Sequence, residues 1–173
     1  MPKQCQVIGC NNNVWGKGYC KIHQYYRTDK KEKKVSTRFI QEEDDLQTLI
    51  DDLDEVTSRM IRFKYAGKDG LVECFTCDAK HPISHIQCGH FIPRLHMATR
   101  FLTDNLRPQC KTCNEYKQGN LTIFAERLEK EKGGITEWLH EQANTVHKFT
   151  RTELKELLLE YRQKLQLYQS KFK

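Results

Sequence analysis

The sequence has no long apolar segment. Its 173 residues are 38% hydrophobic and 30% charged, and the mean hydropathy is -0.77. No run is long enough to span a bilayer, and no apolar signal segment follows Met1, whose neighbours include Lys3 and Gln4. We therefore expect a cytoplasmic protein with one modest hydrophobic core, part of whose stability comes from bound metal.

The acidic residues are unevenly distributed. Residues 42–55 hold eight acidic side chains and no Lys or Arg, although the chain as a whole has a net charge of +6. The remainder is strongly cationic, which suits a polyanionic partner, and nucleic acid is the partner we expect. The alternative is that the basic residues only keep the protein in solution. The acidic stretch is most simply a solvated helix face.

The first 23 residues contain three cysteines and a histidine in a segment too short to form its own core. In a reducing cytosol, cysteines at this spacing favour zinc over disulfides. With four ligands the site would be structural, and zinc would serve as the core of the module. The alternative is a set of unligated surface thiols. The four expected ligands are Cys5, Cys10, Cys20 and His23.

Two Cys-x-x-Cys pairs follow in the middle of the chain. Cys74 and Cys77 form the first pair, and Cys110 and Cys113 form the second. Together they can close one tetrahedral zinc site. The segment between the two pairs is longer than a zinc ribbon requires. We therefore expect it to contain residues with a role other than binding the structural zinc.

Two long helices are predicted outside this region. Apolar residues repeat at spacings of three and four within residues 38–66, which places them on one stripe of a helix. A second stripe, from Leu154 to Phe172, lies in the C-terminal segment 146–173, and Thr150 with Glu153 is typical of a capping box. We favour packing of each helix on the zinc domain or on the other helix. The alternative is a coiled-coil seam in a homodimer.

The segment between the cysteine pairs carries residues suited to phosphodiester cleavage, which needs a base, a divalent ion and a scaffold that holds both. We expect a β-hairpin within residues 83–92 that presents His90 as the base, because imidazole is partly neutral at cytosolic pH. Asn105 would orient the loop through amide hydrogen bonds. Asn114, in a helix that begins at Lys111, would ligate Mg²⁺ or Mn²⁺ through its carbonyl oxygen.

Several short motifs between Leu53 and the C-terminus occur together with these three residues. They are Ser58-Arg59-Met60-Ile61-Arg62, Gly89-His90-Phe91, Thr99-Arg100-Phe101, Pro108-Gln109-Cys110, Cys113-Asn114 and Gly119-Asn120. The combination resembles the HNN variant of the HNH endonuclease superfamily, and within it the phage NinG (Rap) recombination protein family. This resemblance implies a metal-dependent, structure-selective DNA endonuclease that acts on Holliday junctions and D-loops in a bacterial host cell.

The sequence departs from the broader superfamily at one position. Many HNH sites have an acidic metal ligand just before the first histidine, where this chain has Gly89. Asp104 and His96 are the nearest candidates to replace it, although His96 is more simply a surface or phosphate-contacting histidine. Cys88 is left over from the two zinc sites, and we interpret it as a small buried hydrophobic residue.

Basic residues surround the motif and are suited to contacting phosphates on either side of the scissile one. The alternative is ordinary surface charge. Tyr116 is expected either to stack on a base or to pack against the hairpin. The expected DNA-binding residues are Arg94, Arg100, Arg107, Lys111 and Lys117.

These features predict an α+β protein with a small zinc-bound ββα-metal (treble-clef) core flanked by long helices. The expected order is a zinc module at 1–27, a basic linker at 28–37, a helix at 38–66, a nuclease domain at 67–145 and a helix at 146–173. Two other functions remain open. One is an HNH nuclease that cuts ordinary duplex DNA, and the other is a non-catalytic zinc module that binds nucleic acid.

Overall fold

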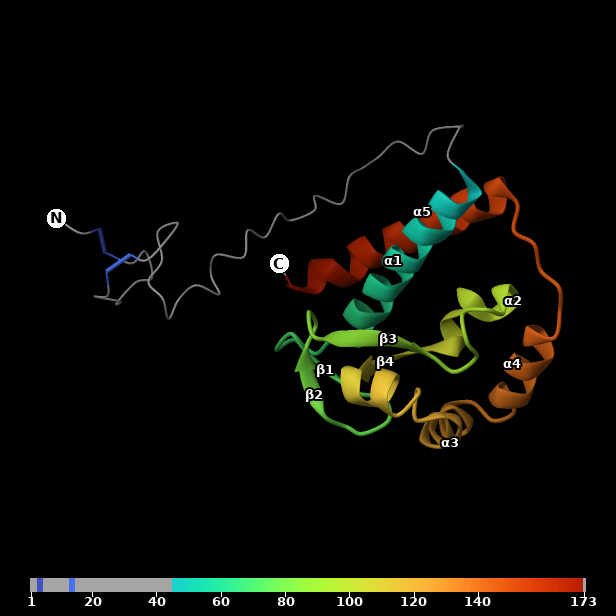
Figure 1. Ribbon diagram of the computed structural model, residues 1–173, viewed down its shortest axis with the longest axis horizontal. Helices are drawn as coiled ribbons and strands as arrows, with labels where there is room; N and C mark the ends of the chain where they lie inside the picture. Colours follow the sequence, from blue (N-terminus) through green and yellow to red (C-terminus); the bar gives the residue numbers. More distant parts are fainter. Residues whose placement is uncertain (1–2, 5–12, 15–44, 173) are drawn as a thin grey trace. The chain divides into compact units, whose positions relative to one another are not determined.

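The computed structural model describes residues 3–4, 13–14 and 45–172 (Figure 1). The chain divides into two units, residues 1–41 and 42–173. In the first unit an isolated antiparallel bridge joins Gln4 to Asn13. The expected ligands of the N-terminal zinc module, the basic linker 28–37 and residues 38–44 of the first expected helix lie outside the described residues, so these expectations stay predictions.

Two long helices pack against each other in the second unit, α1 (Leu46–Lys64) and α5 (Arg151–Gln169) (Figure 1). The C-terminal capping box is confirmed, since Glu153 N donates to Thr150 Oγ1 at 3.2 Å and Thr150 N donates to Glu153 Oε2 at 2.7 Å. The buried residues of α1 are Leu49, Leu53, Val56, Thr57, Met60 and Ile61, and those of α5 are Leu154, Leu158, Tyr161 and Leu165.

The apolar stripe of α5 therefore faces the interior of its own chain. Leu154 and Leu158 are 0% exposed, and Tyr161 donates its hydroxyl hydrogen to the carbonyl oxygen of Phe101 at 2.7 Å. Side chains buried in this way are not available to a second copy. The proposed dimer seam along this stripe is wrong, whereas the existence of a homodimer stays a prediction.

Two small antiparallel sheets follow α1. Strand β1 (Leu71–Glu73) pairs with β2 (Lys80–Pro82). Strand β3 (Ile86–His90) pairs with β4 (Leu106–Cys110), so that His90 lies opposite Leu106. In Figure 1 the paired strands β3 and β4 lie between the α1–α5 pair and the helices that follow β4.

The hairpin expected within residues 83–92 is wrong. That segment contains a single strand, β3, whose partner β4 comes from the next part of the sequence. Pro82 and Pro93 bracket the segment, and proline removes a donor that a sheet ladder needs. All five residues of β4 are buried, so pairing with β4 places β3 inside the protein.

Short helices complete this unit. They are α2 (Met97–Arg100), the 3-10 turn η2 (Thr103–Asn105), the π-type turn η3 (Thr112–Tyr116), α3 (Leu121–Glu131), α4 (Ile135–Ala143) and the 3-10 turn η4 (Ser170–Phe172). The helix expected over Lys111–Gln118 is only the turn η3, because Gln118, Gly119 and Asn120 adopt positive φ angles of 49°, 84° and 48° that no α-helix accommodates.

A hydrophobic core separate from the α1–α5 contact joins the end of β3 to the helices α3 and α4. Its buried residues are Phe91, Ile92, Phe124, Leu128, Ile135 and Leu139. The described part of the chain therefore combines helices with small sheets, as the sequence predicted. None of its helices has the length and apolarity needed to cross a membrane.

Candidate active site and metal centre

Four cysteines form a cluster between the two sheets. Cys74 and Cys77 lie in the turn between β1 and β2, Cys110 ends β4, and Cys113 lies in η3. Their sulfur atoms all lie within 4.8 Å of one another, and the Sγ atoms of Cys77 and Cys110 are 3.8 Å apart. A tetrahedral ion with sulfur ligands at about 2.3 Å requires sulfur–sulfur separations of about 3.8 Å. The cluster therefore fits a metal such as zinc.

The surroundings of these thiols are also consistent with a bound cation. Burial and, to a smaller extent, the neighbouring sulfur atoms of Cys74, Cys113 and Cys110 raise the pKa of Cys77 to about 12. Four thiols this close cannot all ionise without a positive charge among them, and a coordinated metal supplies that charge. Metal would join the β1–β2 turn to the end of β4 and to η3.

His90 and Asn114 line one pocket. His90 is the last residue of β3, Asn114 lies on η3, and the cavity that they share has a volume of about 330 Å³. Within the described residues, Nε2 of His90 is buried and has no hydrogen-bond partner. Such an atom calls for an explanation, and a water, ion or substrate atom in the pocket is one.

The imidazole of His90 is neutral at neutral pH. Burial and, to a smaller extent, the positive charge of Arg94 lower its pKa to about 4, although the carboxylate of Asp54 acts in the opposite direction. A neutral imidazole can accept a proton. The sequence analysis expected a partly neutral imidazole, whereas burial keeps this one neutral, and its role as a general base stays a prediction.

Asn105 fixes the loop that follows His90. Its side chain is 0% exposed, and Oδ1 accepts a hydrogen bond from the backbone N–H of Ile92 at 2.6 Å. Its Nδ2 donates to the carbonyl oxygens of Ile92 and Thr99, both at 3.0 Å. These contacts are the orienting hydrogen bonds expected from the sequence.

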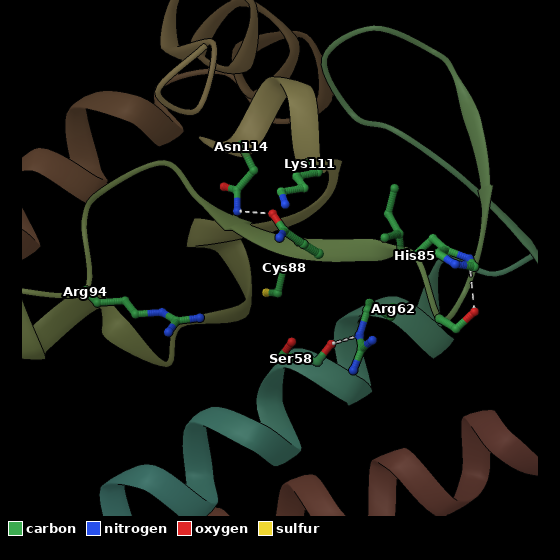
Figure 2. Close-up of a pocket in the computed structure, with 10 residues that line it drawn as sticks. Ser58, Arg62, His85, Cys88, Arg94, Lys111 and Asn114 are labelled. Carbon is green, nitrogen blue, oxygen red and sulfur yellow. Dashed lines mark hydrogen bonds between the residues drawn. The ribbon is translucent and has the colours of Figure 1, made fainter. Parts of the chain in front are cut away.

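The side-chain amide of Asn114 is oriented by a neighbour on β3. Nδ2 donates to Oε1 of Gln87 at 2.8 Å, and Nε2 of Gln87 donates to Oε1 of Glu115 at 2.5 Å. In Figure 2 the carbonyl oxygen of Asn114 points away from this hydrogen bond. That oxygen is the atom through which an amide binds a cation.

A family model described as Bacteriophage Lambda NinG protein matches residues 3–171. The chain belongs to the NinG family. The matched range includes all eight cysteines and every candidate residue named above. No curated protein and no solved structure matches the chain.

The structure explains the glycine that this NinG-family chain has before His90. A Cβ atom at Gly89 would lie 2.1 Å from Oε1 of Gln109. Gln109 is 0% exposed, and its Nε2 donates to Thr76 Oγ1 at 3.1 Å and to the carbonyl oxygen of Gly119 at 2.7 Å. Gln109 is thus held in place, and an acidic side chain does not fit at position 89.

Neither expected replacement for that acidic residue lies in the pocket of His90. The carboxylate of Asp104 accepts a hydrogen bond from Nζ of Lys132 at 3.2 Å. Nδ1 of His96 lies 3.1 Å from the carbonyl oxygen of Ala143, where it joins α2 to the end of α4. Both assignments are corrected, since neither residue lines the cavity.

Two of the five expected DNA-binding residues are engaged within the protein. Arg107 is 7% exposed, pairs with Glu131 at 2.6 Å and donates to backbone carbonyl oxygens. Its assignment as a phosphate contact is wrong, because its hydrogen-bonding groups are used internally. Arg100 makes a two-point ion pair with Asp54, at 2.5 and 3.2 Å.

The other three basic residues remain accessible. Arg94 is 49% exposed and lies 3.9 Å from Asp54, Lys111 is 61% exposed, and Lys117 is exposed. Tyr116 is 74% exposed, so it does not pack against the hairpin.

The remaining cysteine behaves as expected. Cys88 is 5% exposed, and burial raises the pKa of its thiol to about 12. It is a buried neutral side chain rather than a nucleophile.

The sequence analysis missed Asp54 and Arg62. Asp54 pairs with Arg100 across 46 positions of the chain, and Arg62 lines a second pocket beside Asn114. No short-range pattern reveals a pair so far apart. The only available signal was the position of Arg62 within a family motif.

Proposed function

We propose that this NinG-family protein is a metal-dependent DNA endonuclease of the HNH type, in its HNN variant, with a treble-clef core built on the four-cysteine cluster. One observation carries the proposal: His90 and Asn114, from different elements, line one pocket. The loop that leads away from His90 is held by Asn105. An imidazole and an amide on a rigid scaffold thus line one pocket, and this arrangement supports the proposed roles of base and metal ligand.

In the proposed reaction the neutral imidazole of His90 takes a proton from the attacking water. Asn105 holds the loop, and Gln87 holds the amide of Asn114, so that neither group has to reorganise as charge develops. Arg94, which lines the same pocket, is placed to stabilise negative charge on the phosphate.

A divalent ion would neutralise charge on the phosphate and on the leaving oxygen. Among the described residues, no carboxylate lines the pocket of His90. The residues present therefore fit such an ion only in part, through Oδ1 of Asn114 together with oxygens of the bound phosphate. Mg²⁺ commonly binds in this way, with few protein ligands and several phosphate or water oxygens.

We expect branched recombination intermediates, Holliday junctions and D-loops, as substrates. Membership of a phage family and the cationic composition support DNA as the partner. Two nicks in one junction would require paired active sites, so a homodimer belongs to the same proposal.

The test is incubation of the purified protein with a labelled Holliday junction, a D-loop and a linear duplex of matched sequence, with Mg²⁺ or without divalent ions. Cleavage of the branched substrates alone, dependent on Mg²⁺ and lost in His90→Ala, is the expected result. Equal cutting of the duplex would indicate a general HNH nuclease. Binding without cutting, under Mg²⁺ or Mn²⁺, would overturn the enzymatic proposal and indicate a binding module.

A further inference from the structure

A second pocket adjoins the one that contains His90. Its volume is about 400 Å³, and its lining has three cations, Arg62, Arg94 and Lys111, together with His85. No acidic side chain lines it among the described residues. Figure 2 shows that these residues come from α1, from the turn before β3, from the loop after β3 and from the segment after β4. Segments far apart in sequence thus place positive charge around one cavity.

Arg62 differs from the other cations of this pocket because it has no carboxylate partner among the described residues. Its Nε donates to the carbonyl oxygen of Ser58 at 3.2 Å, and its Nη1 donates to that of Ile83 at 3.3 Å. Burial lowers the pKa of Arg62, and within the described part of the chain it makes no ion pair with a carboxylate. Partly buried charges are normally paired. Among residues 45–172 the fixed guanidinium therefore has no carboxylate within ion-pair distance.

The two pockets form neighbouring parts of one surface. Cys88, Arg94 and Asn114 line both of them. Strand β3 runs from Ile86, in the cationic pocket, to His90, in the other. At the rise of a β-strand the two ends lie about 13 Å apart. An extended polyanion that reaches His90 can therefore also reach Arg62.

We propose that Arg62, Lys111 and His85 bind a backbone phosphate of the DNA strand, a few nucleotides from the phosphate that is cleaved. Arginine suits this role because its guanidinium carries five donors, and Nη2 of Arg62, which donates to neither Ser58 nor Ile83, can donate to the phosphate. This inference rests on the proposed function for the identity of the ligand, DNA. It does not rest on the chemistry assigned to His90.

The test measures binding of a Holliday junction by the His90→Ala protein without divalent ions, so that cleavage does not interfere whatever the role of His90. A set of junctions carries one neutral methylphosphonate each, at successive positions along one strand. We expect one position to weaken binding about tenfold or more, because one charge-assisted contact is lost. In the Arg62→Gln variant of the same protein, that position should have a smaller effect than when Arg62 is present, because Lys111 and His85 still contact the phosphate. The variant should bind the unmodified junction about tenfold more weakly.

Lys111→Gln provides a second variant at an exposed side chain, 3.8 Å from the carboxylate of Glu115. It should remove part of the same effect. Arg151→Gln is the matched control, since it removes an equal charge from an exposed position at the start of α5. The proposal is overturned if Arg62→Gln binds as tightly as the control, or if the methylphosphonate profile is unchanged in Arg62→Gln. Cleavage by the wild type would still support the proposed function in either case.

Discussion

At the scale of single residues, the candidate site was predictable where spacing carries the chemistry. Order along the chain and distance from the cysteine pairs were enough to select His90, Asn105 and Asn114. The structure places His90 and Asn114 at one pocket. The reason for Gly89 was not predictable. It depends on Gln109, which lies on a partner strand and reaches the space that a Cβ would need.

Gly89→Ala should therefore destabilise the protein by about 1 to 3 kcal/mol through overpacking. Gln109→Ala should also destabilise it, because two buried hydrogen bonds are lost. The double variant should be more stable than the sum of the two losses predicts, because removing the Gln109 side chain frees the space. Urea denaturation measures all three values, and strict additivity would contradict the proposed contact.

Tyr161 predicts a pH dependence of stability. Burial raises its pKa from 10.0 to about 12, so the folded protein keeps the hydroxyl proton at pH values where the unfolded chain releases it. Its contribution is present below pH 10 and is lost as pH rises toward 12, by about 2 to 3 kcal/mol in total. Denaturation of wild type and Tyr161→Phe across this range should show the steeper decline in the wild type. An equal decline of stability with pH in the two proteins would contradict the raised pKa of Tyr161.

At the scale of elements, the helices were predictable and the strand partners were not. The apolar stripes of α1 and α5 repeat within each helix, so a local pattern contains the information. The partner of β3 is β4, and the loop between them includes α2 and η2. Such pairing depends on burial of β4 in the tertiary structure, which a local pattern does not record.

The packing of α5 on its own chain leads to a prediction with a close internal control. Leu158 is 0% exposed, whereas the adjacent Leu159 is 54% exposed. Leu158→Ala should cost about 2 to 5 kcal/mol of unfolding free energy, as other buried leucines do. Leu159→Ala should stay within about 0.5 kcal/mol of the wild type. Similar losses in both variants would show that the exposed face of α5 is also covered, for instance by a second copy.

At the scale of the whole molecule, the four-cysteine cluster joins the two sheets and supports the candidate site. Cys77→Ser should remove one zinc ion per chain and lower the melting temperature, because metal binding contributes directly to folding free energy. Cys88→Ala is the control, since that buried cysteine lies outside the cluster. Its zinc content should equal that of the wild type. Mass spectrometry measures the zinc content of both variants. An unchanged zinc content in Cys77→Ser would contradict the assignment of the four cysteines as metal ligands.

The proposed endonuclease depends on His90 more than on any other residue. The most direct measurement is the single-turnover rate of Holliday junction cleavage, with enzyme in excess and Mg²⁺ present, for wild type, His90→Ala and His147→Ala. His147 is an exposed histidine that lines neither pocket. Loss of a general base predicts a decrease of about 100-fold or more in His90→Ala, with an unchanged rate in the control and unchanged junction affinity in both. A His90→Ala protein that cleaves at the wild-type rate would contradict the account.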